Sequence, residues 1–185
     1  MSKKSNRPVI AVTGGGQGIG RGILIYFCER GYDAVVLDKN LDTAKTVAEE
    51  CCKLGADAIA VHCDVTDRTD VEKAYAEIDK YFGQIDVQVN NAGVFIRERI
   101  MDATPEKTDL MIDVNLKGVL NTAKAAMEIM KKQGKGVMIN AHSILGFFPD
   151  HGLGVYSATK AGVAVLTRVL ASECAPYGIR VNGYA

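Results

Sequence analysis

Short apolar runs alternate regularly with longer amphipathic segments, and this alternation constrains the fold more than any other feature of the sequence. Several of the short runs are continuously apolar, which is typical of strands covered on both faces. We expect strands at residues 8–13, 33–37, 58–62, 86–90, 136–140 and 178–182, and helices at 18–29, 42–54, 69–82, within 105–132, and at 155–175. Because parallel crossovers are right-handed, the pattern predicts an α/β fold with a doubly wound parallel sheet of six strands.

Length and charge exclude several classes of protein. The 185 residues suffice for one domain with a proper core, so we expect residues 1–185 to form a single domain. Lys plus Arg number 22 and Asp plus Glu number 22, so the chain lacks the basic excess that nucleic acid attracts. No apolar run approaches the roughly 20 residues that span a bilayer. The apolar stretch after the basic start, residues 9–12, is too short for a signal peptide.

The cysteines indicate a reducing compartment. They are odd in number and form no C-x-x-C pair, a pattern that argues against a disulfide framework. The five are Cys28, Cys51, Cys52, Cys63 and Cys174. Together with the missing signal peptide, they predict reduced thiols and a cytoplasmic protein.

A glycine-rich turn separates the first predicted strand from the first predicted helix. Residues 13–20 read TGGGQGIG. Glycines allow a sharp turn and let the backbone approach a ligand, and the following helix presents unpaired N–H groups to an anion. Loops also collect glycine for steric reasons, but the position after a first strand favours a site for the diphosphate of a dinucleotide.

Asp38 closes the second predicted strand, about 20 residues past the glycine turn. An acid at this distance accepts hydrogen bonds from the adenosine ribose and repels a 2′-phosphate. No arginine lies in the turn, so the sequence favours NAD over NADP. Lys39 weakens the argument, since it could pair with a phosphate, and a solvated acid at a strand end is also common.

Tyr156 and Lys160 are four residues apart on a predicted helix, which places them on one face. A free tyrosine titrates near pH 10 and is a poor base at neutral pH, whereas a neighbouring cation favours the phenolate. The pair could therefore transfer a proton. An amphipathic helix with one exposed lysine would produce the same spacing, so the pair alone decides little.

Four further features accompany this pair. Asn90-Asn-Ala-Gly93 follows the fourth predicted strand, Ser143 follows the fifth, Asp64-Val65 follows the third, and Asn115 lies in the long helix. In this order and on these elements, the motifs resemble the short-chain dehydrogenase/reductase family over nearly the whole chain. The resemblance implies a Rossmann fold and transfer of a hydride between a nicotinamide and a substrate carbon.

The resemblance assigns catalytic roles to four residues. Tyr156 would be the general acid/base at the substrate oxygen, and Lys160 would bind the nicotinamide ribose and favour the phenolate of Tyr156. Ser143 would hydrogen-bond the substrate carbonyl or alkoxide. Asn115 would hold a water that connects Lys160 to solvent.

The resemblance also implies a set of residues that contact NAD. Those bordering the diphosphate would be Gly14, Gln17, Gly18, Ile19 and Gly20. Those along the adenosine and the nicotinamide ribose would be Asp38, Asp64, Val65, Asn91, Ala92, Gly93, Tyr156 and Lys160. No metal is expected, because His62, His142 and His151 lack ligand spacing. We interpret His151 as a surface-loop residue, although it could reach the substrate pocket.

Two departures from the family pattern bear on activity. His142 stands before Ser143 where many relatives have a second serine, which predicts a pocket of different polarity. Relatives also continue past the sixth strand with a substrate lid and a seventh strand, and we expect both to be missing from the domain formed by residues 1–185.

The substrate is predicted less sharply than the chemistry. The runs INAHS, at 139–143, and VNGY, at 181–184, look similar to acetoin/diacetyl reductases and 2,3-butanediol dehydrogenases, so we expect a small secondary alcohol or ketone, or a polyol. The alternatives are a 3-oxoacyl thioester carried on acyl carrier protein, a hydroxysteroid, a non-catalytic dinucleotide sensor, and a dehydratase or epimerase. The family further implies a homotetramer or homodimer, and the helix at 155–175 has many apolar residues for one core stripe.

Overall fold

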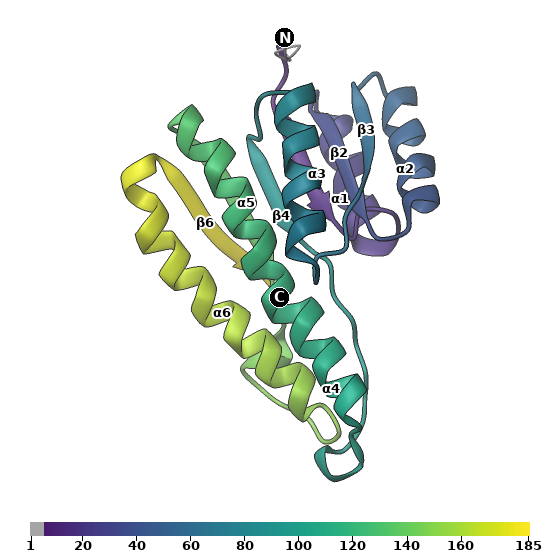
Figure 1. The fold of residues 1–185 in the computed structure, drawn as a ribbon, viewed down its shortest axis with the longest axis vertical. Coiled ribbons are helices and arrows are strands. Elements are labelled where there is room, and N and C mark those ends of the chain that lie inside the picture. The colour runs from purple at the N-terminus through teal and green to yellow at the C-terminus, as the bar shows by residue number, and fades with distance from the viewer. Residues whose placement is uncertain (1–5) are drawn as a thin grey trace.

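A parallel sheet forms the centre of the computed structural model, which describes residues 6–185 (Figure 1). Within those residues the strands are β1 (Val9–Thr13), β2 (Asp33–Asp38), β3 (Ala58–His62), β4 (Val87–Asn90), β5 (Gly136–Ala141) and β6 (Ile179–Tyr184). Their order is β3-β2-β1-β4-β5-β6, with every neighbouring pair parallel. The predicted doubly wound sheet is therefore confirmed, and its order reverses between β1 and β4, where such sheets open a crevice at the carboxyl ends of their strands.

Helices cover both faces of the sheet. They are α1 (Gly18–Cys28), α2 (Leu41–Lys53), α3 (Arg68–Tyr81), α4 (Pro105–Ile112), α5 (Gly118–Gln133) and α6 (Gly154–Cys174). One apolar core packs α1 and α2 against the sheet, and a second packs α3, α5 and α6 against the opposite face (Figure 1). The two cores hold the carboxyl ends of the strands, and the loops that follow them, in fixed positions.

The long helix predicted within 105–132 is not one regular helix. A π-helical turn, Asp113–Lys117, joins α4 to α5. The other predicted elements are found with their ends moved by one or two residues, and short 3-10 turns at Ile100–Asp102, Ile144–Gly146 and Ala175–Tyr177 were not expected. These turns are too short to show a periodic pattern in the sequence.

Burial follows position in the sheet. The central strands β1 and β4 are buried along their whole length, as continuous apolar runs predict. The edge strands β3 and β6 are only partly buried. Among residues 6–185 no helix is long and apolar enough to cross a bilayer. Part of the basic start used in the signal-peptide prediction, residues 1–5, lies outside the described residues.

Candidate active site

A cleft of about 490 Å³ opens at the carboxyl ends of β1, β2, β3 and β4. Of the thirteen residues predicted to contact the cofactor, all but Gly20, Tyr156 and Lys160 belong to the described lining of this cleft. The lining comprises Gly14, Gln17, Gly18, Ile19, Asp38, Lys39, Cys63, Asp64, Val65, Thr66, Asn91, Ala92, Gly93, Val94, Leu110 and Val114. The fold thus gathers motifs that are up to 100 residues apart in the sequence.

The glycine turn suits a diphosphate for two reasons. Gly18 has φ +54°, a conformation that favours glycine, and a side chain there would meet open space. The helix that begins at Gly18 has no side-chain cap from any described residue and no acid in its first turn. Its first N–H groups and positive dipole end are therefore available to an anion in the cleft.

Asp38 lines the cleft at the end of β2 and is held by the backbone. Its carboxylate accepts from the N–H of Gly16 at 2.9 Å and from the N–H of Asn40 at 2.9 Å. Each carboxylate oxygen keeps a further acceptor position for a ribose hydroxyl. The turn and Asp38 thus form one hydrogen-bonded unit.

Lys39 is paired across the cleft. Its Nζ lies 2.6 Å from Asp64 Oδ2. Burial raises the pKa of Asp64, but hydrogen bonds from Lys39 and Thr66 outweigh burial, and the net pKa is lowered. The sequence analysis left Lys39 open as a phosphate partner. In this structure its charge is matched by Asp64, so a phosphate would have to compete for it.

Lys160 carries a buried ammonium group at the other end of the site. Its side chain donates to Ala141 O at 2.8 Å, and its Nζ lies 5.8 Å from the centre of the Tyr156 ring. Burial lowers the pKa of Lys160 from 10.5 to about 8. A methyl group at Gly93 would lie 3.6 Å from Lys160 Nζ, so the ammonium adjoins the cleft.

Asn115 projects from the π-helical turn and is fully buried. Its Oδ1 accepts from Val94 N at 2.8 Å, while its Nδ2 donates to Val94 O at 2.9 Å and to Thr159 Oγ1 at 3.3 Å. The side chain therefore ties the loop after β4 to α6. The structure brings Asn115 and Lys160 together beside Gly93.

Tyr156 and Ser143 both lie beside the loops after β4 and β5. Tyr156 is in the first turns of α6, half-exposed, with the ring of Phe95 packed edge-on at a centroid distance of 4.9 Å. Ser143 lies two residues past the end of β5, and its Oγ accepts from Leu145 N at 3.2 Å, which caps the 3-10 turn that packs on α6. Both hydroxyls remain able to donate to a ligand.

His142 and His151 differ in burial. His142 packs edge-on against Phe147, and burial, with Lys160 and Arg168 nearby, lowers its pKa. Its Nδ1 finds no hydrogen-bond partner within the described part of the chain. His151 is exposed in a loop, as interpreted from the sequence. No three His, Cys, Asp or Glu side chains among residues 6–185 are grouped to hold a metal ion.

Three residues that the sequence analysis did not single out support the site. Thr13 Oγ1 accepts from Asn91 N at 3.0 Å and Ala92 N at 3.1 Å, which joins the ends of β1 and β4. Thr159 accepts from Asn115, and Tyr184 donates to Asn91 Oδ1 at 2.8 Å. Position in the sequence was the signal that could have found two of them, because Thr13 ends a predicted parallel strand and Tyr184 follows another, at the edge where ligands bind.

Comparison with known proteins identifies the family. The family model for short chain dehydrogenases matches residues 8–185. The chain belongs to the short-chain dehydrogenase/reductase family. A 3-oxoacyl-[acyl-carrier-protein] reductase, FabG, of Staphylococcus aureus is 39% identical over 175 residues, which are 94% of this chain and 71% of that protein.

Two solved structures share the fold. A short-chain dehydrogenase/reductase from Mycobacterium marinum is 32% identical, with a TM-score of 0.91, over 98% of this chain and 73% of that chain. NAD⁺-bound xylitol dehydrogenase is 29% identical, with a TM-score of 0.93, over 98% of this chain and 70% of that chain. As a short-chain dehydrogenase/reductase, the protein is an oxidoreductase that acts on CH–OH groups. The expectation of an acetoin-type substrate is not confirmed by these relatives, whose names include its 3-oxoacyl alternative.

Proposed function

We propose that this short-chain dehydrogenase/reductase interconverts a ketone and a secondary alcohol with NAD(H), in a single catalytic domain formed by residues 1–185. One observation carries the proposal. A buried ammonium, that of Lys160, lies between Ala141 O, the Tyr156 ring and Gly93 at the end of a cleft shaped for a dinucleotide. A structural lysine gains nothing from such burial, because desolvation disfavours its charge.

The chain's own residues manage one proton and one developing charge. The bound dinucleotide supplies or accepts the hydride. In ketone reduction, Tyr156 donates its hydroxyl proton to the substrate oxygen, and the positive field of Lys160 stabilises the phenolate that remains. Ser143 donates a hydrogen bond to the same oxygen. Asn115 holds the loop after β4 against α6. By the family resemblance it would also hold a water that connects Lys160 to solvent.

Asp38 and the Lys39–Asp64 pair favour NAD over NADP. The Asp38 carboxylate faces the cleft with free acceptor positions for ribose hydroxyls and repels a 2′-phosphate. Lys39, a basic side chain in the lining of the cleft, already pairs with Asp64 at 2.6 Å. The NAD⁺-bound state of the related xylitol dehydrogenase is in line with this choice.

For the substrate class we propose a 3-oxoacyl thioester. The relatives named for that reaction support it, and so do exposed apolar side chains on the loops after β4 and β5. Phe95 packs on the Tyr156 ring, and the others on these loops are Ile100, Met101, Ile144, Phe147 and Phe148. A hydrocarbon chain would bury this surface, whereas a small diol would leave most of it in water. The second candidate, a small diol or polyol, is supported by the resemblance to xylitol dehydrogenase.

A substrate panel with a matched pair of variants tests the proposal. Purified protein is assayed with NADH and a 3-oxoacyl thioester, and with NAD and butanediol, xylitol and a hydroxysteroid. Tyr156→Phe lowers turnover by about 10² to 10⁴-fold, because it removes the general acid, and leaves NAD affinity nearly unchanged. Tyr177→Phe, at an exposed tyrosine, is the control. Tight NAD binding without turnover of any substrate would instead indicate a dinucleotide sensor.

We further propose a homodimer or homotetramer in the cytoplasm, formed through the face that carries α5 and α6. Leu120, Val165 and Val169 are exposed there, and a groove of about 430 Å³ lies nearby between α3, α5 and α6. All five cysteines carry free thiols in the described chain, which fits a reducing compartment.

A further inference from the structure

A hydrogen bond joins the edge strand β6 to the loop after β4. The Tyr184 hydroxyl donates to Asn91 Oδ1 at 2.8 Å, although the two residues are 93 positions apart. The Tyr184 ring is half-buried and packs against the apolar core under α1 and α2, as the side chain of Ile139 also does. Burial raises the pKa of Tyr184, so the hydroxyl keeps its proton and remains a donor at neutral pH.

The other end of the Asn91 amide holds the start of the glycine turn. Asn91 Nδ2 donates to Thr13 O at 3.0 Å and to Gly14 O at 3.2 Å. An asparagine amide has two donors on nitrogen and only acceptors on oxygen. The carbonyls of Thr13 and Gly14 can only accept, so they fix the orientation in which both amide protons face the turn. The Tyr184 hydroxyl donates to Oδ1 and so stabilises that orientation.

The turn is built closely around this amide. A methyl group at Gly20 would lie 2.8 Å from Asn91 Nδ2, and one at Gly14 would lie 3.2 Å from it. Two glycines of the dinucleotide motif thus leave room for the Asn91 side chain. The sequence analysis placed Asn91 along the cofactor, but its amide is directed under the turn.

We propose that Tyr184 is a positioning residue for the dinucleotide. By donating to Oδ1 it anchors the Asn91 side chain, whose amide holds the carbonyls of Thr13 and Gly14, and with them the turn proposed to receive the diphosphate. The inference rests on the proposed function, since it requires a dinucleotide in this cleft. A turn that is already held in its binding geometry loses less freedom when the ligand arrives, which tightens binding.

Tyr184→Phe tests the proposal, with Tyr177→Phe as the matched control. The probes are NAD, ADP-ribose, which contains the diphosphate, and adenosine, which lacks it. Tyr184→Phe lowers the affinity for NAD and for ADP-ribose by about threefold to tenfold, which is the effect of losing one neutral hydrogen bond. Adenosine affinity stays unchanged, because its contacts at Asp38 and Asp64 are untouched. The KM for NAD rises more than kcat falls, since the lost hydrogen bond holds Asn91 and the glycine turn and does not involve Tyr156 or Ser143.

A second readout needs no ligand. In NMR spectra of the free protein, the Asn91 side-chain NH₂ exchanges with solvent faster in Tyr184→Phe than in wild type. Asn91→Asp, which lacks both N–H donors, lowers the affinity for ADP-ribose further than Tyr184→Phe does. Adding Tyr184→Phe to Asn91→Asp does not lower that affinity any more.

The outcomes separate the inference from the proposed function. Wild-type-like ADP-ribose affinity in Tyr184→Phe, in a protein that binds and uses NAD, overturns the inference alone. An equal loss of affinity for adenosine in Tyr184→Phe also overturns the inference, because it would indicate a general loss of structure. A wild-type protein that binds neither NAD nor ADP-ribose overturns both.

Discussion

Lys160 is the side chain whose environment opposes its charge most clearly. It is 5% exposed and its pKa falls from 10.5 to about 8 because of burial. That shift corresponds to roughly 3 kcal/mol of destabilisation while the group is charged. A site that keeps such a group trades stability for a cation beside Tyr156.

Lys160→Met is therefore expected to stabilise the fold while abolishing turnover. Allowing for the lost bond to Ala141 O, the gain at pH 7 is about 1–3 kcal/mol in urea unfolding. Below pH 8 both folded and unfolded lysine are protonated, so the cost is fully present. Between pH 8 and 10.5 the folded lysine loses its proton first, so wild type gains stability relative to the variant. A difference that is constant from pH 7 to 10 contradicts this account.

The proposed preference for NAD also rests on a single residue, Asp38. In Asp38→Asn the charge that repels a 2′-phosphate is absent, and the preference for NAD over NADP in kcat/KM falls by about tenfold or more. Asp42→Asn, whose side chain is exposed at the start of α2, is the control and retains the preference. A wild type that prefers NADP would show the NAD assignment to be wrong.

At the scale of elements, the π-helical turn between α4 and α5 decides where Asn115 points. The wider turn interrupts the regular helix. Asn115 hydrogen-bonds to the loop after β4 on one side and to α6 on the other. π-helical turns are often found at functional sites. Helical periodicity in the sequence gives no sign of one extra residue in a turn, so this detail was not predicted.

Asn115→Ala removes both bonds to Val94 and the bond to Thr159. We expect a loss of about 2–3 kcal/mol in stability, together with a lower kcat, because the loop next to Gly93 is no longer held. Lys117→Ala, which breaks an exposed pair with Asp113 in the same turn, should cost less than about 1 kcal/mol. Thermal or urea unfolding and steady-state kinetics measure both. Equal effects of the two substitutions would refute a special role for Asn115.

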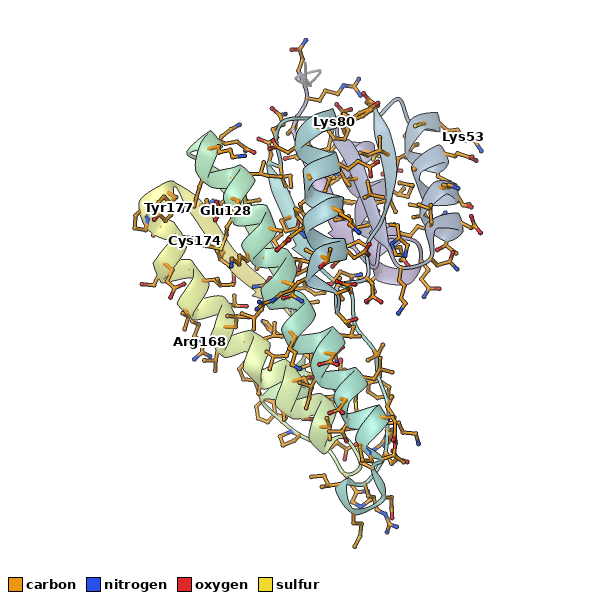
Figure 2. The ribbon with its side chains drawn as sticks, in the orientation of Figure 1. Lys53, Lys80, Glu128, Arg168, Cys174 and Tyr177 are labelled. Carbon is orange, nitrogen blue, oxygen red and sulfur yellow. The ribbon has the colours of Figure 1, made fainter. Side chains whose placement is uncertain are left out.

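At the scale of the whole molecule, the apolar residues of α6 are divided between the core and the surface. Val163 and Leu170 are buried in the core, whereas Val165 and Val169 are exposed by 58% and 46%. The apolar excess predicted from the sequence is thus partly core and partly surface. Figure 2 shows the charged side chains of Arg168 on α6 and Glu128 on α5, on the same side of the sheet as these valines. Exposed apolar side chains with flanking charges of both signs suit a contact between copies of the chain.

Light scattering is expected to show a dimer or tetramer for the wild-type protein. Val165→Arg combined with Val169→Arg should shift it to a smaller species, since two desolvated charges oppose association, and leave circular dichroism unchanged. Leu54→Arg, at a 43% exposed leucine after α2, is the control. A monomeric wild type, or dissociation by Leu54→Arg alone, would rule out this face as the interface.

The sequence by itself determined the α/β class, the order of strands and helices, and the position of the glycine turn and Asp38 at the ends of the first two strands. Local patterns suffice for this, because apolar runs and glycine clusters reflect local backbone preferences, and parallel strands must end at a common edge. Only the tertiary structure decided which side chains meet across that edge. The pairing of Lys39 with Asp64, the bond from Tyr184 to Asn91 and the burial of Lys160 all depend on strand order and register between distant segments. No local pattern in the chain contains that information.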